Sequence, residues 1–351
     1  MGVRNNDPRP KNRGVVVRSG DTLIVNGYDV VYEAFATREH HFMETPHLYI
    51  PRQLIGYDGL IFGAYGERWK NIRKFTMTVL RDFGVGHATL KERIMAELEA
   101  VTAAANVICS INFGDRFEYS NEKFQRLLNV TDELFSMRLI TAVDNVMPIL
   151  RFIPNGFLPK ALAIFTEIRR FTQEVIDEHR STFDPENIRD FVDYYLLAAH
   201  ESAHKDSDVT IAKGVELDSF SDSHLFQILA NLFNGGTETT ATSLGWLFLY
   251  LLKYPDVQRK EQQEIDTYTH AMIVEMQRHA NIAAIGPPHA PLRDTFWHRY
   301  NIPRKSMIIA NLWSVHRDPK YWHNADAYDP DRWLDKDGKF VKREAFLPFL
   351  I

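Results

Sequence analysis

The chain has 351 residues, 45% of them hydrophobic, which is enough to fill the core of one large globular domain. Its 41 basic and 46 acidic residues are spread along the sequence and give a net charge of -5, which argues against nucleic acid as a partner. The single cysteine, Cys109, excludes an internal disulfide or a multi-cysteine zinc site and is typical of a reducing compartment. Residues 1–18 contain no apolar stretch long enough for a signal peptide or a membrane anchor.

The chain opens with a predicted β hairpin over residues 14–26, in which two β-branched runs flank Ser19-Gly20-Asp21. Helical periodicity then dominates from residue 28 to about residue 282. A polar stretch over residues 201–220 predicts a surface loop inside this helical body. The remaining pattern predicts helices over residues 30–36, 68–80, 90–98, 101–112, 121–136, 158–179 and 188–200.

Beyond residue 283 the sequence changes character, because seven prolines break it into short strands and turns. We therefore predict a single, mainly α domain with small β-sheets. It would consist of the N-terminal hairpin, the helical body and an irregular region over residues 283–351.

The longest predicted helix covers residues 222–253, between Ser221 as its cap and Pro255 as a stop signal. Its 32 residues contain no proline and would span about 48 Å. Polar side chains such as Asn231 and Glu238 would be costly in lipid, so we expect a core helix and not a transmembrane span.

The centre of this helix carries two adjacent glycines, Gly235 and Gly236, each of which costs about 1 kcal/mol relative to alanine in a helix interior. Without side chains, this stretch lets a flat ligand approach the backbone. The hydroxyl of Thr239 can bond the carbonyl of Gly235, and Glu238 with Thr239 could relay protons to a bound reactant. The alternative is close helix–helix packing at a glycine contact.

Trp69 and Arg73 lie four residues apart and so share one face of a predicted helix. The indole N–H and the guanidinium are both donors suited to a carboxylate. The alternative is a surface stacking contact between the two side chains.

Two further groups of residues lie near the C-terminal end. Glu275 and Arg278 form an i,i+3 pair on a predicted helix, and Arg332 in the irregular region could pack on Glu275 to make a buried charge triad. His289 follows Pro287-Pro288, and its imidazole could donate to an anionic ligand.

Taken in chain order, these motifs resemble those of the cytochrome P450 family, most closely the animal family 2 type of microsomal monooxygenase. The resemblance covers nearly the whole chain. The segments that carry it are residues 26–31, 66–69, 78–84, 106–110, 235–240 and 311–319.

The resemblance implies a mainly α fold around heme, with Gly235 and Gly236 over the oxygen-binding face. Thr239 and Glu238 would then assist protonation of dioxygen. Residues that match the propionate-binding positions of the family are Trp69, Arg73 and His289. Those that match its structural triad are Glu275, Arg278 and Arg332.

The same resemblance implies a monooxygenase that inserts one oxygen atom from O2 into a lipophilic small molecule. An NADPH-dependent flavoprotein reductase would supply the electrons. The resemblance also implies a location at the cytosolic face of the endoplasmic reticulum membrane.

The chain departs from the family pattern near Ile351, because the iron-binding cysteine of the family lies a few residues beyond the segment that matches residues 346–349. Cys109 lies in an apolar helical setting that predicts an inert thiol. Related sequences also carry additional helical residues where Ala100 meets Val101 and where Asp266 meets Thr267.

We therefore expect a truncated, inactive chain with low heme occupancy, which lacks the membrane anchor and resides in the cytoplasm. The alternative function is a non-enzymatic helical protein that binds apolar ligands or a partner.

Overall fold

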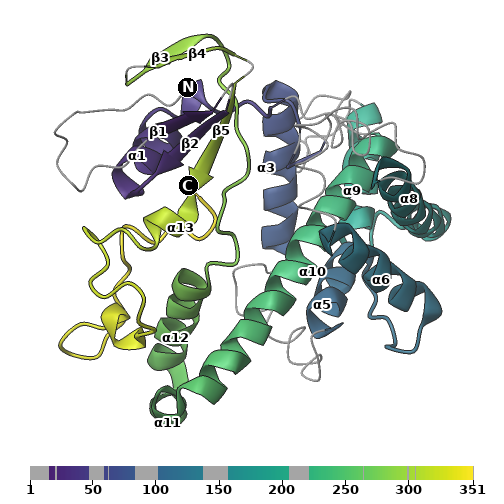
Figure 1. Cartoon of the computed structure of the whole chain (residues 1–351). Coiled ribbons are helices and arrows are strands. Elements are labelled where there is room, and N and C mark those ends of the chain that lie inside the picture. The colour runs from purple at the N-terminus through teal and green to yellow at the C-terminus, as the bar shows by residue number, and fades with distance from the viewer. Residues whose placement is uncertain are drawn as a thin grey trace. The chain divides into compact units, whose positions relative to one another are not determined.

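A computed structural model of the chain describes residues 16–19, 22–46, 59–61, 63–83, 102–136, 157–204, 221–263, 265–298, 300–304 and 306–350. The chain divides into two compact units (Figure 1). The first unit comprises Met1–Pro46 and Thr242–Ile351, and the second comprises His47–Ala241. The long helix α10 (Asp222–Lys253) contributes residues to both. The single domain expected from the sequence stays a prediction.

The first unit contains a three-stranded sheet of β1 (Val16–Ser19), β2 (Thr22–Asn26) and β5 (Met307–Asn311). β1 pairs antiparallel with β2, which confirms the predicted hairpin, and β2 pairs parallel with β5. Leu23 and Val25 point to the core side of β2, since both are fully buried while Ile24 between them is exposed. The two ends of the sequence thus share one sheet (Figure 1).

The rest of the first unit is helices and short strands around this sheet. They are α1 (Tyr28–Tyr32), a π-helical turn Glu33–Thr37, a 3-10 turn Glu39–His41, α11 (Pro255–Gln263), α12 (Ile265–Ala280), the hairpin β3 (Thr295–Trp297) and β4 (Tyr300–Ile302), α13 (Leu312–Val315) and a 3-10 turn Pro330–Trp333. Pro255 starts α11 as well as ending the preceding helix, because proline is favourable at the first helical position. The irregular region predicted beyond residue 283 is present.

The second unit is helical in its described part. It contains α3 (Glu67–Asp82), α5 (Thr102–Phe113), α6 (Glu122–Ser136), α8 (Phe157–Thr182), α9 (Phe191–His204) and the first part of α10. The helices expected over residues 68–80, 101–112, 121–136, 158–179 and 188–200 are therefore confirmed, with small shifts at their ends. The predicted helix 90–98 lies outside the described residues, as does all of the loop 201–220 except residues 201–204, which belong to α9.

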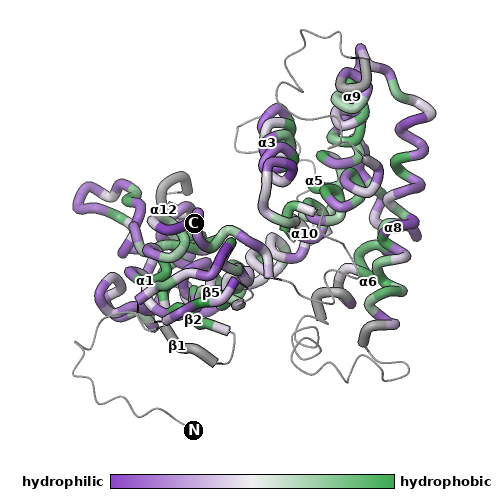
Figure 2. Tube along the Cα trace, turned by 90° about the horizontal axis from the view of Figure 1, so that it is seen from above, coloured by the Kyte–Doolittle hydropathy of each residue, from purple (hydrophilic) through white to green (hydrophobic). Residues whose placement is uncertain are grey.

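Amphipathic packing holds these helices together. Hydrophobic and hydrophilic residues alternate along α8 (Figure 2), and its apolar side buries residues such as Ile168 and Ile176. The central core of the unit combines apolar side chains of α3, α5, α6, α8, α9 and α10. At the start of α10, Ser221 Oγ accepts a hydrogen bond from the backbone N–H of His224 at 3.3 Å, as an N-cap residue should. No helix in the described ranges, α10 included, is long and apolar enough to cross a membrane.

A buried histidine anchors the segment before the C-terminal end of the described chain. His316 is fully buried, and its Nδ1 lies 3.0 Å from Asn281 Oδ1 while its Nε2 accepts the backbone N–H of Leu347 at 3.1 Å. Because Nε2 is an acceptor, the proton of the neutral ring sits on Nδ1 and is donated to Asn281. Burial, reinforced by the charges of Arg278 and Arg317, lowers the pKa of His316 from 6.5 to about 3.

This depressed pKa makes stability depend on pH. The folded state holds the ring neutral, so its contribution is complete above pH 6.5 and is lost as the pH falls toward about 3. We expect His316→Ala to lower the free energy of unfolding at neutral pH by about 2 kcal/mol, because it leaves two buried polar groups unpaired, and to flatten its acid dependence. Urea unfolding followed by circular dichroism at several pH values measures both effects. Replacement of the exposed His323 by alanine is the control, and an equal effect there would contradict the assignment.

Candidate functional site

The two glycines at the centre of α10 differ in what surrounds them. A Cβ atom added to Gly236 would lie 2.4 Å from Cδ1 of Ile108 on α5, so this position is a close helix–helix contact. A Cβ atom added to Gly235 would meet nothing within 4 Å, and the residue is exposed. Close helix–helix packing, which is the alternative that the sequence leaves open, therefore applies to Gly236. At Gly235 the backbone is open to a ligand.

The predicted back-bond in this segment is present. The hydroxyl of Thr239 donates to the carbonyl oxygen of Gly235, one turn earlier, and α10 remains helical through it. Glu238 and Thr239 are both half-buried. A carboxyl group and a hydroxyl therefore occupy consecutive positions beside the open glycine.

Trp69 and Arg73 share a face of α3, as the spacing predicts, and the guanidinium of Arg73 lies 5.4 Å from the centre of the indole ring. The indole N–H donates to the carbonyl oxygen of Leu60 at 3.0 Å. The stacking alternative is therefore realised, and the indole donor already has an acceptor. A close turn holds this arrangement, because a Cβ atom on Gly63 would lie 2.1 Å from the carbonyl oxygen of Gly59.

In the first unit, His289 packs against Phe35 with ring centres 4.8 Å apart, and its Nδ1 lies 3.1 Å from the carbonyl oxygen of Phe42. Since a carbonyl only accepts, Nδ1 carries the hydrogen. Burial lowers the pKa of His289, so the ring is neutral and its Nε2 presents a lone pair. This Nε2 is buried and has no hydrogen-bond partner in the described part of the chain. The donor role expected from the sequence thus requires protonation of Nε2.

The carboxylate of Glu275 collects donors from two segments. It receives Nε and Nη2 of Arg278 at 2.8 Å each, Nε of Arg332 at 3.0 Å, the indole N–H of Trp333 at 2.9 Å and the backbone N–H of Asp329 at 3.0 Å. Glu275 and Arg278 are fully buried. The contact predicted between Arg332 and Glu275 is therefore present.

Arg278 extends this network to the carbonyl oxygens of His316, Ala325 and Ala327, at 2.8, 2.9 and 3.1 Å. These acceptors lie in the winding segment after α13. The guanidinium of Arg278 consequently provides these carbonyl groups with the hydrogen bonds that regular secondary structure would otherwise supply.

We expect Glu275→Ala to lower the free energy of unfolding by about 3–5 kcal/mol, because it leaves the buried guanidinium of Arg278 without its counter-charge. The exposed i,i+3 pair Glu67–Lys70, with N and O 2.7 Å apart, is the matched control, and Glu67→Ala should leave the free energy of unfolding nearly unchanged. Denaturant titration of the two variants measures the difference. Similar losses in both would contradict the role of the buried carboxylate.

Cys109 lies on α5, is fully buried and belongs to the apolar core of the second unit. A thiol buried among apolar side chains is inert. This setting matches the prediction of an inert thiol and argues against Cys109 as an iron ligand.

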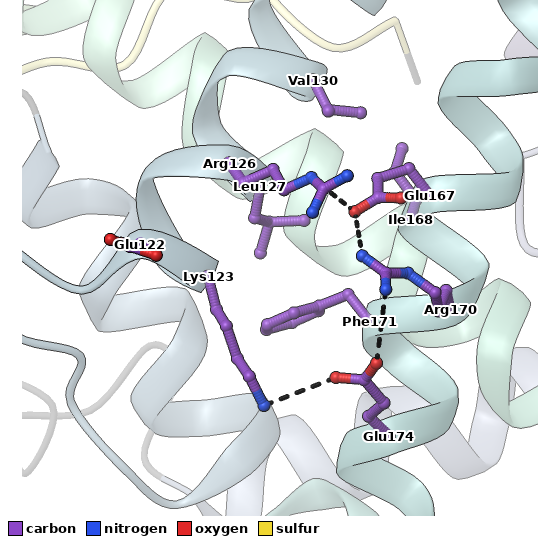
Figure 3. Close-up of a pocket in the computed structure, with 10 residues that line it drawn as sticks. All are labelled: Glu122, Lys123, Arg126, Leu127, Val130, Glu167, Ile168, Arg170, Phe171 and Glu174. Atoms are coloured by element: carbon purple, nitrogen blue, oxygen red, sulfur yellow. Dashed lines mark hydrogen bonds and ion pairs between the residues drawn. The ribbon is translucent and has the colours of Figure 1, made fainter.

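Two cavities in the second unit contain none of the residues predicted for the site. One, of about 290 Å³, lies between α6 and α8, where Arg126 and Arg170 converge on Glu167 at 2.7 Å each and Lys123 lies 3.4 Å from Glu174 (Figure 3). Its charged side chains neutralise one another. Such a network of ion pairs is better suited to joining α6 to α8 than to binding an ion.

The other cavity, of about 490 Å³, borders a buried pair in which Nε2 of His179 lies 2.7 Å from Oδ2 of Asp190. With Asp193 they are close enough to hold a metal ion, but Arg189 already pairs with Asp193 at 2.6 Å. Burial lowers the pKa of His179, and the bond to Asp190 outweighs this and raises it overall. Sequence reasoning missed this cluster, because His179 and Asp190 follow no recognisable metal-binding spacing.

A sequence profile of the family described as Cytochrome P450 matches residues 99–349. The chain belongs to the cytochrome P450 family. The match includes α10, His289 and the Glu275 network, and it begins after Trp69 and Arg73. Cytochromes P450 are heme-dependent monooxygenases, so heme is the cofactor that this family membership implies.

Curated relatives agree with this membership. The chain is similar to cytochrome P450 2J3 of Rattus norvegicus (34% identity, 93% of this chain and 70% of the relative). It is also similar to human cytochromes P450 2J2 (34%, 94% and 71%) and 2U1 (32%, 93% and 65%). The alignment with the rat P450 runs over 367 positions, more than the 351 residues of the chain, so that relative contains residues that this P450 lacks.

Two features of the described residues are suited to binding parts of a heme group. The open backbone at Gly235 accommodates a flat macrocycle, and the unpartnered nitrogen of His289 is suited, once protonated, to an anionic group. The second unit therefore offers an open backbone position for a flat ligand, and the first unit separately offers a buried nitrogen for an anionic group, whereas Cys109 does not fit as an iron ligand.

Proposed function

We propose that this cytochrome P450 inserts one oxygen atom from O2 into a lipophilic small molecule, with electrons from an NADPH-dependent flavoprotein reductase at the endoplasmic reticulum membrane. The observation that carries the proposal is the open backbone of Gly235 beside Glu238 and Thr239 on α10. Heme, when bound, would supply dioxygen binding and activation. The protein would position the reactants, exclude water and supply protons.

Thr239 would act through its oxygen. Because the hydroxyl hydrogen points to the carbonyl of Gly235, Oγ1 would act as an acceptor for a hydrogen bond from a protonated species or a water. Glu238, the neighbouring acid, would replace the proton that is consumed.

Arg73 and His289 would bind the propionates. Arg73 is exposed and held by its stacking on Trp69, while the indole N–H would have to leave Leu60 before it could donate to a carboxylate. His289 would donate from Nε2 after protonation. Guanidinium and imidazolium donors to carboxylates make charge-assisted hydrogen bonds, which are stronger than neutral ones.

Heme binding tests the role of Gly235 directly. We expect Gly235→Leu to lower heme affinity at least about tenfold, since its side chain would fill the space left for the macrocycle, and a loss of about 1.4 kcal/mol corresponds to that factor. Gly245→Leu is the matched control, because Gly245 is also a helical glycine of α10 with nothing within 4 Å of an added Cβ atom. Heme titration followed by absorbance measures both affinities. Equal affinities in the two variants would overturn the placement.

Proton delivery is tested by turnover of the heme-loaded protein with reductase and a panel of lipophiles. We expect Thr239→Ala to reduce product formation about 100-fold, as is typical when a proton-transferring group is removed, with less effect on heme content. The neighbouring, exposed Thr240 is the control, and Thr240→Ala should retain the full rate. An unchanged rate in Thr239→Ala would contradict the relay, and absence of any oxygenated product from the unaltered protein would contradict the function.

A further inference from the structure

The first unit contains a cluster of tyrosines outside the residues discussed so far. The rings of Tyr250 and Tyr328 have centres 4.3 Å apart with an interplanar angle of 28°, and Tyr254 lies 5.9 Å from Tyr250 and 5.1 Å from Tyr328. Tyr250 and Tyr328 are only 6% and 7% exposed. Phenylalanine would pack equally well here, so the hydroxyl groups need a separate explanation.

The hydroxyl of Tyr250 is hydrogen-bonded to Nδ1 of His279 on α12. The other ring nitrogen, Nε2, lies 2.9 Å from the carbonyl oxygen of Asp326. Since a carbonyl only accepts, Nε2 carries the hydrogen and Nδ1 of the neutral ring is the acceptor. Tyr250 therefore donates its phenolic hydrogen to a histidine nitrogen.

His279 presents that nitrogen as an unprotonated acceptor. Burial, together with the charges of Arg278 and Arg317, lowers the pKa of His279, so the ring is neutral at neutral pH. The hydroxyl of Tyr328 has a different partner. Tyr328 donates to the carbonyl oxygen of Met272 at 3.1 Å, and a carbonyl is not a base.

The cluster also has a route to the surface. Trp246 precedes Tyr250 by one turn of α10, with ring centres 6.0 Å apart, and Trp246 is 40% exposed. A buried tyrosine with a base, two further stacked tyrosines and an exposed tryptophan are thus in continuous contact. Tryptophan and tyrosine are the protein side chains from which one electron is most easily removed.

We propose that Tyr250 is a redox-active tyrosine that gives one electron to an outer-sphere metal-complex oxidant, such as a ruthenium(III) polypyridyl, and its phenolic proton to His279. Oxidation of a phenol makes it strongly acidic, so loss of the electron is coupled to cleavage of the O–H bond. The products are a neutral tyrosyl radical, a protonated imidazole and the reduced oxidant. An electron from a reductant at the surface, passed through Trp246, restores the phenol as the proton returns from His279.

The two stacked rings stabilise the radical by sharing its unpaired electron. The site would thereby remove oxidising equivalents from the interior and pass them to solvent. This activity is separate from oxygen insertion, and its test needs no heme.

The test uses the purified chain and a ruthenium(III) polypyridyl oxidant generated by a light flash, with the tyrosyl radical followed by its transient absorption. We expect a long-lived radical whose formation slows in D2O. Tyr250→Phe should abolish this component. His279→Gln, which can keep a hydrogen bond but cannot take a proton, should remove both the long lifetime and the isotope effect.

Tyr195→Phe is the matched control, because Tyr195 is also buried and its hydroxyl donates to the backbone carbonyl of Ser221 at 3.0 Å. It should leave the long-lived component unchanged. Trp246→Leu should slow reduction of the radical by added ascorbate, and circular dichroism checks that each variant is folded. A long-lived radical that persists in folded Tyr250→Phe, or an isotope effect that persists in folded His279→Gln, would overturn the proposal and leave the cluster a packing feature only.

Discussion

The buried carboxylate of Glu275 is the interaction on which the first unit depends. A carboxylate removed from water is costly unless its oxygens are fully hydrogen-bonded, and here two arginines, an indole and a backbone N–H meet that demand. The donors come from two pieces of chain, since Arg278 shares α12 with Glu275 and the others belong to the 3-10 turn Pro330–Trp333 and its cap Asp329. Satisfying one charge therefore fixes α12 against the 3-10 turn that contains Trp333, and Arg278 holds the carbonyl groups of the segment between them.

Helix α10 shows how one short sequence serves two demands. Gly236 lets Ile108 of α5 approach, whereas Gly235, one residue away, leaves the backbone accessible. Because successive helical residues point about 100° apart, adjacent glycines can serve different neighbours. The hydroxyl of Thr239 donates to the carbonyl oxygen of Gly235 within this accessible turn. Two adjacent glycines that look equivalent in sequence thus differ in the structure, because packing constrains Gly236 and leaves Gly235 open.

Local chemistry was predictable from sequence wherever it depended on residues close together along the chain. The bounds of α10 follow from its cap, its lack of proline and the proline after it, and the bond between Thr239 and Gly235 follows from helical spacing. One contact between distant residues, that of Arg332 with Glu275, was also predicted, because their charges are opposite. By contrast, the helix α11 was missed because Pro255 was interpreted only as a stop.

Partners that come from a turn or a distant segment were not predictable. The acceptor of the Trp69 indole is the carbonyl of Leu60, presented by a turn whose shape depends on Gly59 and Gly63. The tautomer of His289 is set by Phe42, far away in the sequence. Backbone carbonyls carry no side-chain signature, so a sequence does not reveal which of them lies beside a given donor.

The tautomer of His289 has a consequence for cofactor loading. With its hydrogen committed to the carbonyl of Phe42, the ring can donate to an anion only by gaining a proton at Nε2, and burial opposes that gain until the anion arrives. Under the proposed role of His289, capture of a propionate there would be linked to proton uptake from solvent, so affinity would rise as the pH falls. Retention of the prosthetic group would then depend on the acidity of the compartment.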